Sequence, residues 1–241
     1  MKPEINKIYC GDALKILKSW PNEFVDCVIT SPPYFQMRDY GVDGQIGLEK
    51  TYQEYIAKLV AVFNEVKRVL KKDGTCFVNL GDTYNSGSKG GSGEGETTNN
   101  LQFAKTKEHQ RRGGGQDLSE KSAMLIPERF AIAMVEEKWI LRNKLIWVKP
   151  NAMPESVQDR WKRAHEYIFF FVKNKKYYFE LDAIRTPHKQ ISIDRNKYEQ
   201  GKNALGINVN SITKPSDSPR KITLIPLGAV PPDYFVVNTN S

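Results

Sequence analysis

A turn of two prolines follows a short apolar segment and carries groups that can accept hydrogen bonds. Residues 24–30 (FVDCVIT) predict a buried strand, and Ser31-Pro32-Pro33-Tyr34 ends it abruptly, because consecutive prolines can neither continue a sheet ladder nor enter a helix interior. In open α/β sheets, ligands bind just beyond the carboxyl ends of strands. The Ser31 hydroxyl and the Pro32 carbonyl are therefore candidate ligand contacts. A proline turn that merely caps a strand is the alternative.

This turn and three other parts of the chain resemble, in the same order, the motifs of the amino-methylating DNA methyltransferases. The turn resembles motif IV, written (D/N/S)-PP-(Y/F/W), residues 9–14 (YCGDAL) resemble motif III, and residues 79–84 (NLGDTY) resemble motif VI. The later catalytic-domain motifs are resembled by residues 145–151 (LIWVKPN), Pro154-Glu155-Ser156, Asp159-Arg160 and His165-Glu166-Tyr167. Because motifs III and IV lead the chain, the resemblance, which covers most of residues 5–182, is to the permuted β subgroup.

The resemblance implies a methyl transfer from S-adenosyl-L-methionine to an exocyclic amine of a flipped base in double-stranded DNA. The residues that it implies are Ser31, Pro32, Pro33 and Tyr34 for catalysis, Gly11, Asp12 and Ser31 for the cofactor, and Asp82 for the target base. Asp12 can equally be the N-cap of a helix that begins at Ala13, and Asp82 an ordinary turn residue. We interpret Lys149-Pro150-Asn151 and Arg160 as structural or phosphate-contacting.

The chemistry of such a transfer suits the groups of the proline turn. An exocyclic amine is a poor nucleophile because its lone pair is delocalised into the ring. Two acceptors, the Ser31 hydroxyl and the Pro32 carbonyl, can draw its hydrogens toward a tetrahedral geometry, and the Tyr34 ring offers a flat surface for the base. Serine at the first motif IV position is more typical of the N4-cytosine enzymes, so we favour cytosine, with N6-adenine as the alternative.

The elements that must position this turn alternate along the chain. Strands are expected at residues 7–10, 24–30, 75–80, 141–148 and 167–173, with a further candidate at 177–179, and helices at 13–17, 52–72 and 127–138. Thr51 and Glu54 match a capping box, and Asp73-Gly74 a helix stop. The alternation predicts an α/β fold, a doubly wound and mainly parallel Rossmann-like sheet with an antiparallel edge pair.

Two segments interrupt the alternation. Residues 86–116 are rich in glycine, and we expect a mobile, partly basic loop there. Residues 185–221 are basic, and six residues in them are candidate DNA phosphate contacts, with a solvated basic loop as the alternative: Lys189, Arg195, Lys197, Lys202, Arg220 and Lys221. We therefore expect a catalytic domain at 1–182. Residues 183–241 are expected to hold the target-recognition region and the start of the missing C-terminal cofactor-binding part.

Composition limits the class of protein. The chain has 241 residues, 39% of them hydrophobic, and a formal net charge of +8. This composition excludes a wholly disordered, collagenous or coiled-coil chain, and the charge favours a polyanionic partner such as nucleic acid. The absence of a long apolar run predicts a cytoplasmic location. Cys10, Cys27 and Cys76 lie in apolar stretches and are expected to be buried and reduced, and neither they nor the three histidines have metal-ligand spacing.

The chain departs from the resembled family in one respect. The glycine-rich motif I, which follows the recognition region in the β subgroup and builds much of the cofactor site, is absent from the sequence. The resemblance therefore implies an incomplete sheet with an open edge, and weak cofactor binding by this chain alone. Three explanations stay open: a fragment of a longer enzyme, completion in trans by another polypeptide, or a non-catalytic DNA-binding copy. A cognate restriction endonuclease is a further partner that the family implies.

Overall fold

The computed structural model describes residues 3–85, 117–194 and 227–237. The chain divides into two compact units, one formed by residues 1–178 with 233–241 and the other by residues 179–232. The expected loop at 86–116 lies outside the described residues, as do five of the candidate phosphate contacts: Arg195, Lys197, Lys202, Arg220 and Lys221.

The first unit is built on a mixed sheet with the strand order β1-β2-β4-β3-β5. The strands are β1 (Val25–Thr30), β2 (Leu70–Leu80), β3 (Ile140–Val148), β4 (His165–Val172) and β5 (Tyr234–Val236). β1 pairs with β2 and β3 with β5 in parallel, whereas β4 is antiparallel to both of its neighbours. The expected antiparallel pair is thus β3 with β4, and it lies inside the described sheet rather than at its edge because β5, which the sequence did not predict, pairs with β3.

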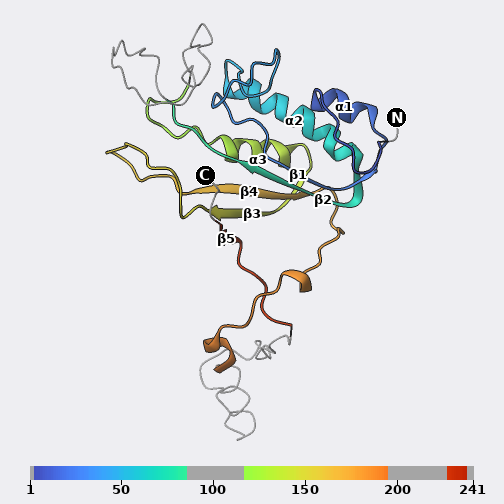
Figure 1. Ribbon diagram of the computed structural model, residues 1–241, viewed down its shortest axis with the longest axis vertical. Helices are drawn as coiled ribbons and strands as arrows, with labels where there is room; N and C mark the ends of the chain where they lie inside the picture. Colours follow the sequence, from blue (N-terminus) through green and yellow to red (C-terminus); the bar gives the residue numbers. More distant parts are fainter. Residues whose placement is uncertain (1–2, 86–116, 195–226, 238–241) are drawn as a thin grey trace, which may run out of the picture. The chain divides into compact units, whose positions relative to one another are not determined.

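Three helices gather on one face of this sheet (Figure 1): α1 (Ala13–Ser19), α2 (Tyr52–Val69) and α3 (Ile126–Glu136). The capping box of Thr51 and Glu54 at the start of α2 is confirmed. The helix ends at Val69 and not at the expected Lys72, because Leu70 already pairs with Val25 and the register shifts between this pair and the next. Gly74 fits this irregular stretch, since a Cβ there would lie 2.8 Å from the Asp26 carbonyl oxygen.

The core fills the space between the helices and the sheet. Alternate residues of β2 and β4 point to it and are fully buried, among them Cys76, Val78 and Phe169. Phe130 of α3 lies at its centre, with its ring 5.2 Å from that of Phe63 on α2. On the opposite face of the sheet Phe77 stacks on Phe170 at 4.6 Å. No helix in the described part of the chain is long and apolar enough to cross a membrane.

Several expectations about apolar segments are wrong. Residues 7–10 and 177–179 form no strand, and Ile8 is 95% exposed. Cys10 and Cys27 are exposed, and of the three cysteines Cys76 is buried. The reason is that an apolar segment becomes a buried strand only where a neighbouring strand or helix covers it.

The carboxyl ends of β1 and β2 lie at the same end of the sheet as the connection from β3 to β4. Thr30 pairs with Val78, Leu80 with Tyr167, and Val148 with His165. The proline turn after β1 and the segments 81–85 and 149–164 therefore share one end of the sheet.

Candidate active site

The proline turn is held in place by hydrogen bonds and close contacts with residues that follow it in the sequence. The Tyr55 hydroxyl donates a hydrogen bond of 2.8 Å to the Pro33 carbonyl, and burial raises the pKa of Tyr55, so the donor keeps its proton. The Gln36 amide donates to the Gly47 carbonyl at 2.6 Å. Gly47 has φ +109°, and a Cβ there would lie 3.1 Å from the Tyr34 carbonyl oxygen. The turn is thus held rigidly, as a preorganised site requires.

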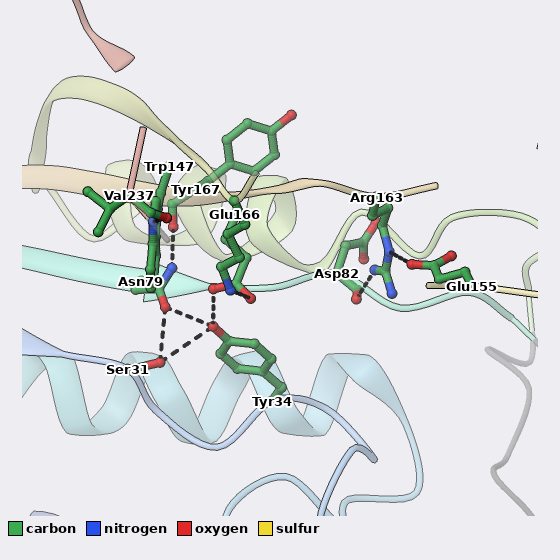
Figure 2. A network of polar contacts seen from close by, with 11 residues as sticks. Ser31, Tyr34, Asn79, Asp82, Trp147, Glu155, Arg163, Glu166, Tyr167 and Val237 are labelled. Carbon is green, nitrogen blue, oxygen red and sulfur yellow. Dashed lines mark hydrogen bonds and ion pairs between the residues drawn. The ribbon is translucent and has the colours of Figure 1, made fainter. Parts of the chain in front are cut away.

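Four side chains meet above the turn (Figure 2). The Ser31 Oγ lies 3.2 Å from Asn79 Oδ1, and the Tyr34 hydroxyl lies 2.8 Å from the same oxygen and 2.9 Å from Glu166 Oε2. Asn79 Nδ2 donates to the Tyr167 carbonyl, which fixes the orientation of the amide. Asn79 Oδ1 can only accept, so the single Ser31 proton can go to this oxygen or, over 3.5 Å, to the Tyr34 hydroxyl. In either case Ser31 Oγ keeps a lone pair for an incoming donor.

An ion pair holds the far side of this network. Lys149 Nζ lies 2.5 Å from Glu166 Oε1, with both side chains largely buried. Burial alone would raise the pKa of Glu166, but hydrogen bonds from Lys149 and Tyr34 outweigh it and hold the pKa below its usual value. Burial raises the pKa of Tyr34 despite its bond with Ser31, and the Glu166 charge adds to the shift. The network therefore contains a charged carboxylate and a protonated phenol.

The Tyr34 ring lies against the backbone of Gly81. A Cβ at this position would lie 2.6 Å from Tyr34 Cε2, so any side chain larger than hydrogen would displace the ring. The ring is therefore fixed both by its hydroxyl and by the glycine under one of its faces.

Asp82 lies beside this network and holds the start of α3. Its two carboxylate oxygens accept hydrogen bonds from the amides of Ile126 at 3.0 Å and Leu125 at 3.1 Å, and its carbonyl accepts one from Arg163. Figure 2 shows it apart from Ser31 and Tyr34. The structure thus assigns Asp82 a capping contact, and its contact with the target base stays a prediction.

Among the described residues, the remaining expected ones make no hydrogen bond or ion pair with the four side chains of the polar network. Asp12 Oδ1 accepts from the Lys15 amide at 2.8 Å and caps α1, so the helix-cap alternative is confirmed. Gly11, which precedes it, is exposed, and the cofactor contacts of both residues stay predictions. Lys189, in the second unit, is exposed, and its carbonyl accepts from the Ser192 and Ile193 amides.

Sequence reasoning did not assign Asn79, Lys149 or Glu166 to the polar network. The pairing of Lys149 with Glu166 is a structural contact inside the site, in line with one of the two interpretations of this residue. The ladder from Val148 to His165 brings these two residues together, but no pattern in the sequence reveals that pairing. The one available signal is the period of two in β2, which places Asn79 on the face opposite Val78 and Leu80.

The fold has a mixed sheet with helices on one face and a rigid proline turn at a strand end. Comparison with known proteins agrees with this fold and assigns a family. The profile of the DNA methylase family matches residues 25–224, so the chain belongs to this family. The solved PvuII DNA methyltransferase (cytosine-N4-specific) shares the fold, with a TM-score of 0.53 and 17% identity over 96% of this chain and 57% of its own.

Curated relatives in this family are type II methyltransferases. M.Cfr9I of Citrobacter freundii is 43% identical over 178 residues, which are 74% of this chain and 58% of that protein. M.SmaI of Serratia marcescens is 40% identical over 189 residues, which are 78% of this chain and 63% of that protein. The chain thus spans about three fifths of the length of these relatives.

Proposed function

We propose that this chain carries the catalytic part of a DNA methyltransferase that methylates an exocyclic amine, with N4 of cytosine as the favoured target. The observation that carries the proposal is the Ser31 hydroxyl, which has donor contacts to Asn79 Oδ1 and to the Tyr34 hydroxyl and so can accept from a ligand through its lone pairs. Serine in this position and the likeness to a cytosine-N4-specific enzyme support cytosine over the N6 of adenine. Double-stranded DNA is the proposed substrate.

The chain's own residues activate the amine. Ser31 Oγ and the Pro32 carbonyl accept its two hydrogens, and no described residue donates to that carbonyl. These acceptors draw the nitrogen toward a tetrahedral geometry, which returns the lone pair from the ring to the nitrogen. Because Asn79, Tyr55 and Glu166 fix the turn before substrate arrives, little reorganisation accompanies the reaction. The Tyr34 ring, backed by Gly81, supports the flipped base.

Gly11, Asp12 and Ser31 carry groups that suit S-adenosyl-L-methionine, which would supply an electrophilic methyl group when bound. Gly11 and Asp12 form an exposed turn, and Asp12 uses one carboxylate oxygen for α1, which leaves the other for a ligand hydroxyl or amine. Ser31 is the proposed cofactor contact that lies beside the target amine. The edge of β1, the strand that Ser31 follows, is covered by no described strand.

The test is methyl transfer by the wild-type chain and by two substitutions. The chain is incubated with mixed-sequence duplex DNA and S-adenosyl-L-methionine, and the digested nucleosides are analysed by mass spectrometry. Ser31→Ala and Tyr34→Ala are expected to lower turnover by about 100-fold or more, as loss of a transition-state contact does, with DNA affinity little changed. Ser119→Ala, an exposed serine on another segment, is the matched control.

Detection of N4-methylcytosine would support the proposal. Detection of N6-methyladenine would show that adenine, the alternative base, is the target. Unchanged turnover in Ser31→Ala would refute the assigned role of the hydroxyl. A wild-type chain that gives no product, even after a complementing polypeptide is added, would favour a non-catalytic DNA-binding function.

We also propose a complementing segment, from the same protein or from a second polypeptide, on the edge of β1. Ile29 in this strand is 80% exposed and Cys27 is exposed as well. Protection of Cys27 from alkylation on addition of such a segment tests this, with buried Cys76 as the internal reference. The proposal is completed by three further parts. Residues 183–232 form the target-recognition region, while the segment from residue 233, which contains β5, begins the cofactor-binding part. The protein acts on DNA in the cytoplasm, beside a cognate restriction endonuclease.

A further inference from the structure

The connection between β3 and β4, here called the β3–β4 loop (residues 149–164), presents two large apolar side chains to solvent. Trp161 is 94% exposed and Met153 is 83% exposed. A fully exposed tryptophan leaves a large apolar surface in water, and tryptophan is a residue type that recurs at binding surfaces. Figure 1 shows the loop projecting beyond the end of the sheet at which the proline turn lies.

The loop is held in shape by its own contacts. Glu155 pairs with Arg160 at 2.7 Å and lies 4.0 Å from Arg163. The guanidinium groups of both arginines lie over the Tyr84 ring, at 4.1 Å and 5.3 Å from its centroid. The base of the loop is closed by the Lys149 amide, which donates to the Ala164 carbonyl at 2.7 Å. These polar contacts therefore hold the backbone of the loop, while the Trp161 side chain takes no part in them and stays exposed to solvent.

The charge of the loop points to a polyanion as the partner. Residues 149–164 contain four Lys or Arg and two Asp or Glu. Lys162, next to Trp161, reaches the Ala152 carbonyl at 3.3 Å and is exposed. Lys149, at the other end, joins the loop directly to the site through Glu166. Lys149, Arg160 and Arg163 face glutamates, whereas Lys162 forms no ion pair within the described part of the chain. A basic group beside an exposed aromatic side chain is a combination that binds stacked bases and their phosphates.

We infer that the β3–β4 loop contacts duplex DNA and that the Trp161 indole inserts into the base stack at the position from which the target base is turned out. The inference rests on the proposed function for its ligand, duplex DNA. Extrusion of a base leaves a gap in the stack, and apolar wedges fill such gaps in other DNA-bending and base-extruding proteins. The indole replaces the stacking that the extruded base gives up.

The first experiment measures binding of the wild-type chain and of Trp161→Ala to a short mixed-sequence duplex and to the same duplex with one abasic site. Wild type is expected to bind the abasic duplex about tenfold more tightly, because the gap already exists. Trp161→Ala is expected to bind the intact duplex about tenfold more weakly and to lose its preference for the abasic one. Tyr178→Ala, which removes a 67%-exposed aromatic side chain near Asp73 at the other end of the sheet, is the matched control.

The salt dependence separates stacking from phosphate contact. Trp161→Ala leaves the slope of log affinity against log salt unchanged, whereas Lys162→Ala lowers it by about one, the value for one lost phosphate contact. Tryptophan emission is followed in parallel. DNA quenches the emission and shields it from acrylamide in wild type, and this change is lost in Trp161→Phe, which leaves the other three tryptophans in place.

Three results would overturn the inference. The first is equal binding of wild type and Trp161→Ala to both duplexes. The second is a loss of affinity accompanied by a smaller salt slope, which would assign a phosphate contact instead. The third is emission of Trp161 already shielded from acrylamide without DNA, which would show that another segment or a second copy covers it. Unchanged circular dichroism of the variants verifies that they fold.

The inference and the proposed function fail in different ways. DNA binding that depends on Trp161, together with the absence of any methylated nucleoside, would contradict the proposed function alone. Methyl transfer by wild type with full binding by Trp161→Ala would contradict the inference alone.

Discussion

The two sides of the first unit differ in how their apolar residues are covered. On the closed side, formed by α2, α3, β2 and β4, the helix α2 buries Tyr55, Leu59, Phe63, Val66 and Val69. On the open side, formed by residues 5–19 and β1, the helix α1 buries none of its residues, and Ile8 and Ile29 are 95% and 80% exposed. The two sides contain similar apolar patterns in the sequence. The difference shows that an apolar sequence pattern does not create a core by itself. A helix or strand forms core only where another element packs against its apolar residues.

The candidate site lies where these two sides meet. Ser31 and Tyr34 follow the open-side strand β1, but their hydrogen-bond partners Asn79 and Glu166 come from the closed-side strands β2 and β4. The closed side thus fixes the geometry of the turn, while the open side leaves it accessible. This division explains how the activating groups can be ordered although one edge of the sheet is uncovered.

The largest expected effect contrasts the two sides directly. Phe130→Ala removes a fully buried ring that lies 5.2 Å from Phe63, and it is expected to lower the free energy of unfolding by about 3–5 kcal/mol. Ile8→Ala, on the open side, is expected to change it by less than about 0.5 kcal/mol. Urea unfolding of both variants measures this. A cost of more than about 1 kcal/mol for Ile8→Ala would show that the open side is covered in solution.

An intermediate effect is expected at the junction of the two sides. Glu166→Gln removes the charge that pairs with Lys149, and it is expected to lower the free energy of unfolding at pH 7 by about 1–2 kcal/mol, between the values for exposed and buried pairs. Folding lowers the pKa of Glu166, so its stabilisation is complete above the unfolded pKa of about 4.3 and is lost as the pH falls through the folded value.

Unfolding measured from neutral to acidic pH tests this dependence. Wild type is expected to lose stability more steeply below about pH 4.3 than Glu166→Gln does. Glu180→Gln, an exposed glutamate in the second unit, is the control and should follow wild type. Parallel curves for wild type and Glu166→Gln would contradict the role given to the ion pair.

The smallest effects compare the caps of two helices. Thr51→Ala removes the capping box of α2 and is expected to cost about 1 kcal/mol of global stability. Asp12→Ala removes the cap of α1 but is expected to leave global stability almost unchanged, because a helix without buried residues can unfold locally. Hydrogen exchange resolves the second case, with faster exchange confined to the amides of α1. An equal global cost for both variants would remove the distinction between the two sides.

The sequence by itself determined the local features whose causes are local. Two adjacent prolines end β1 at Thr30, the capping box starts α2 at Tyr52, and the apolar periods place β3, β4 and α3 within two residues of their expected starts. The proline turn and its candidate acceptors were also evident, since residue type and strand end are both visible in the chain.

Only the tertiary structure decided which segments pair and which side chains meet. The strand order brought Glu166 to Tyr34, over a separation of 132 residues, and placed β3 and β4 inside the sheet, where β5 covers one of them. It also left residues 7–10 without a strand partner among the described residues, although their apolar character matched that of true strands. The physical reason is that strand pairing and burial depend on neighbours distant in sequence, and these neighbours are fixed only when the whole sheet has formed.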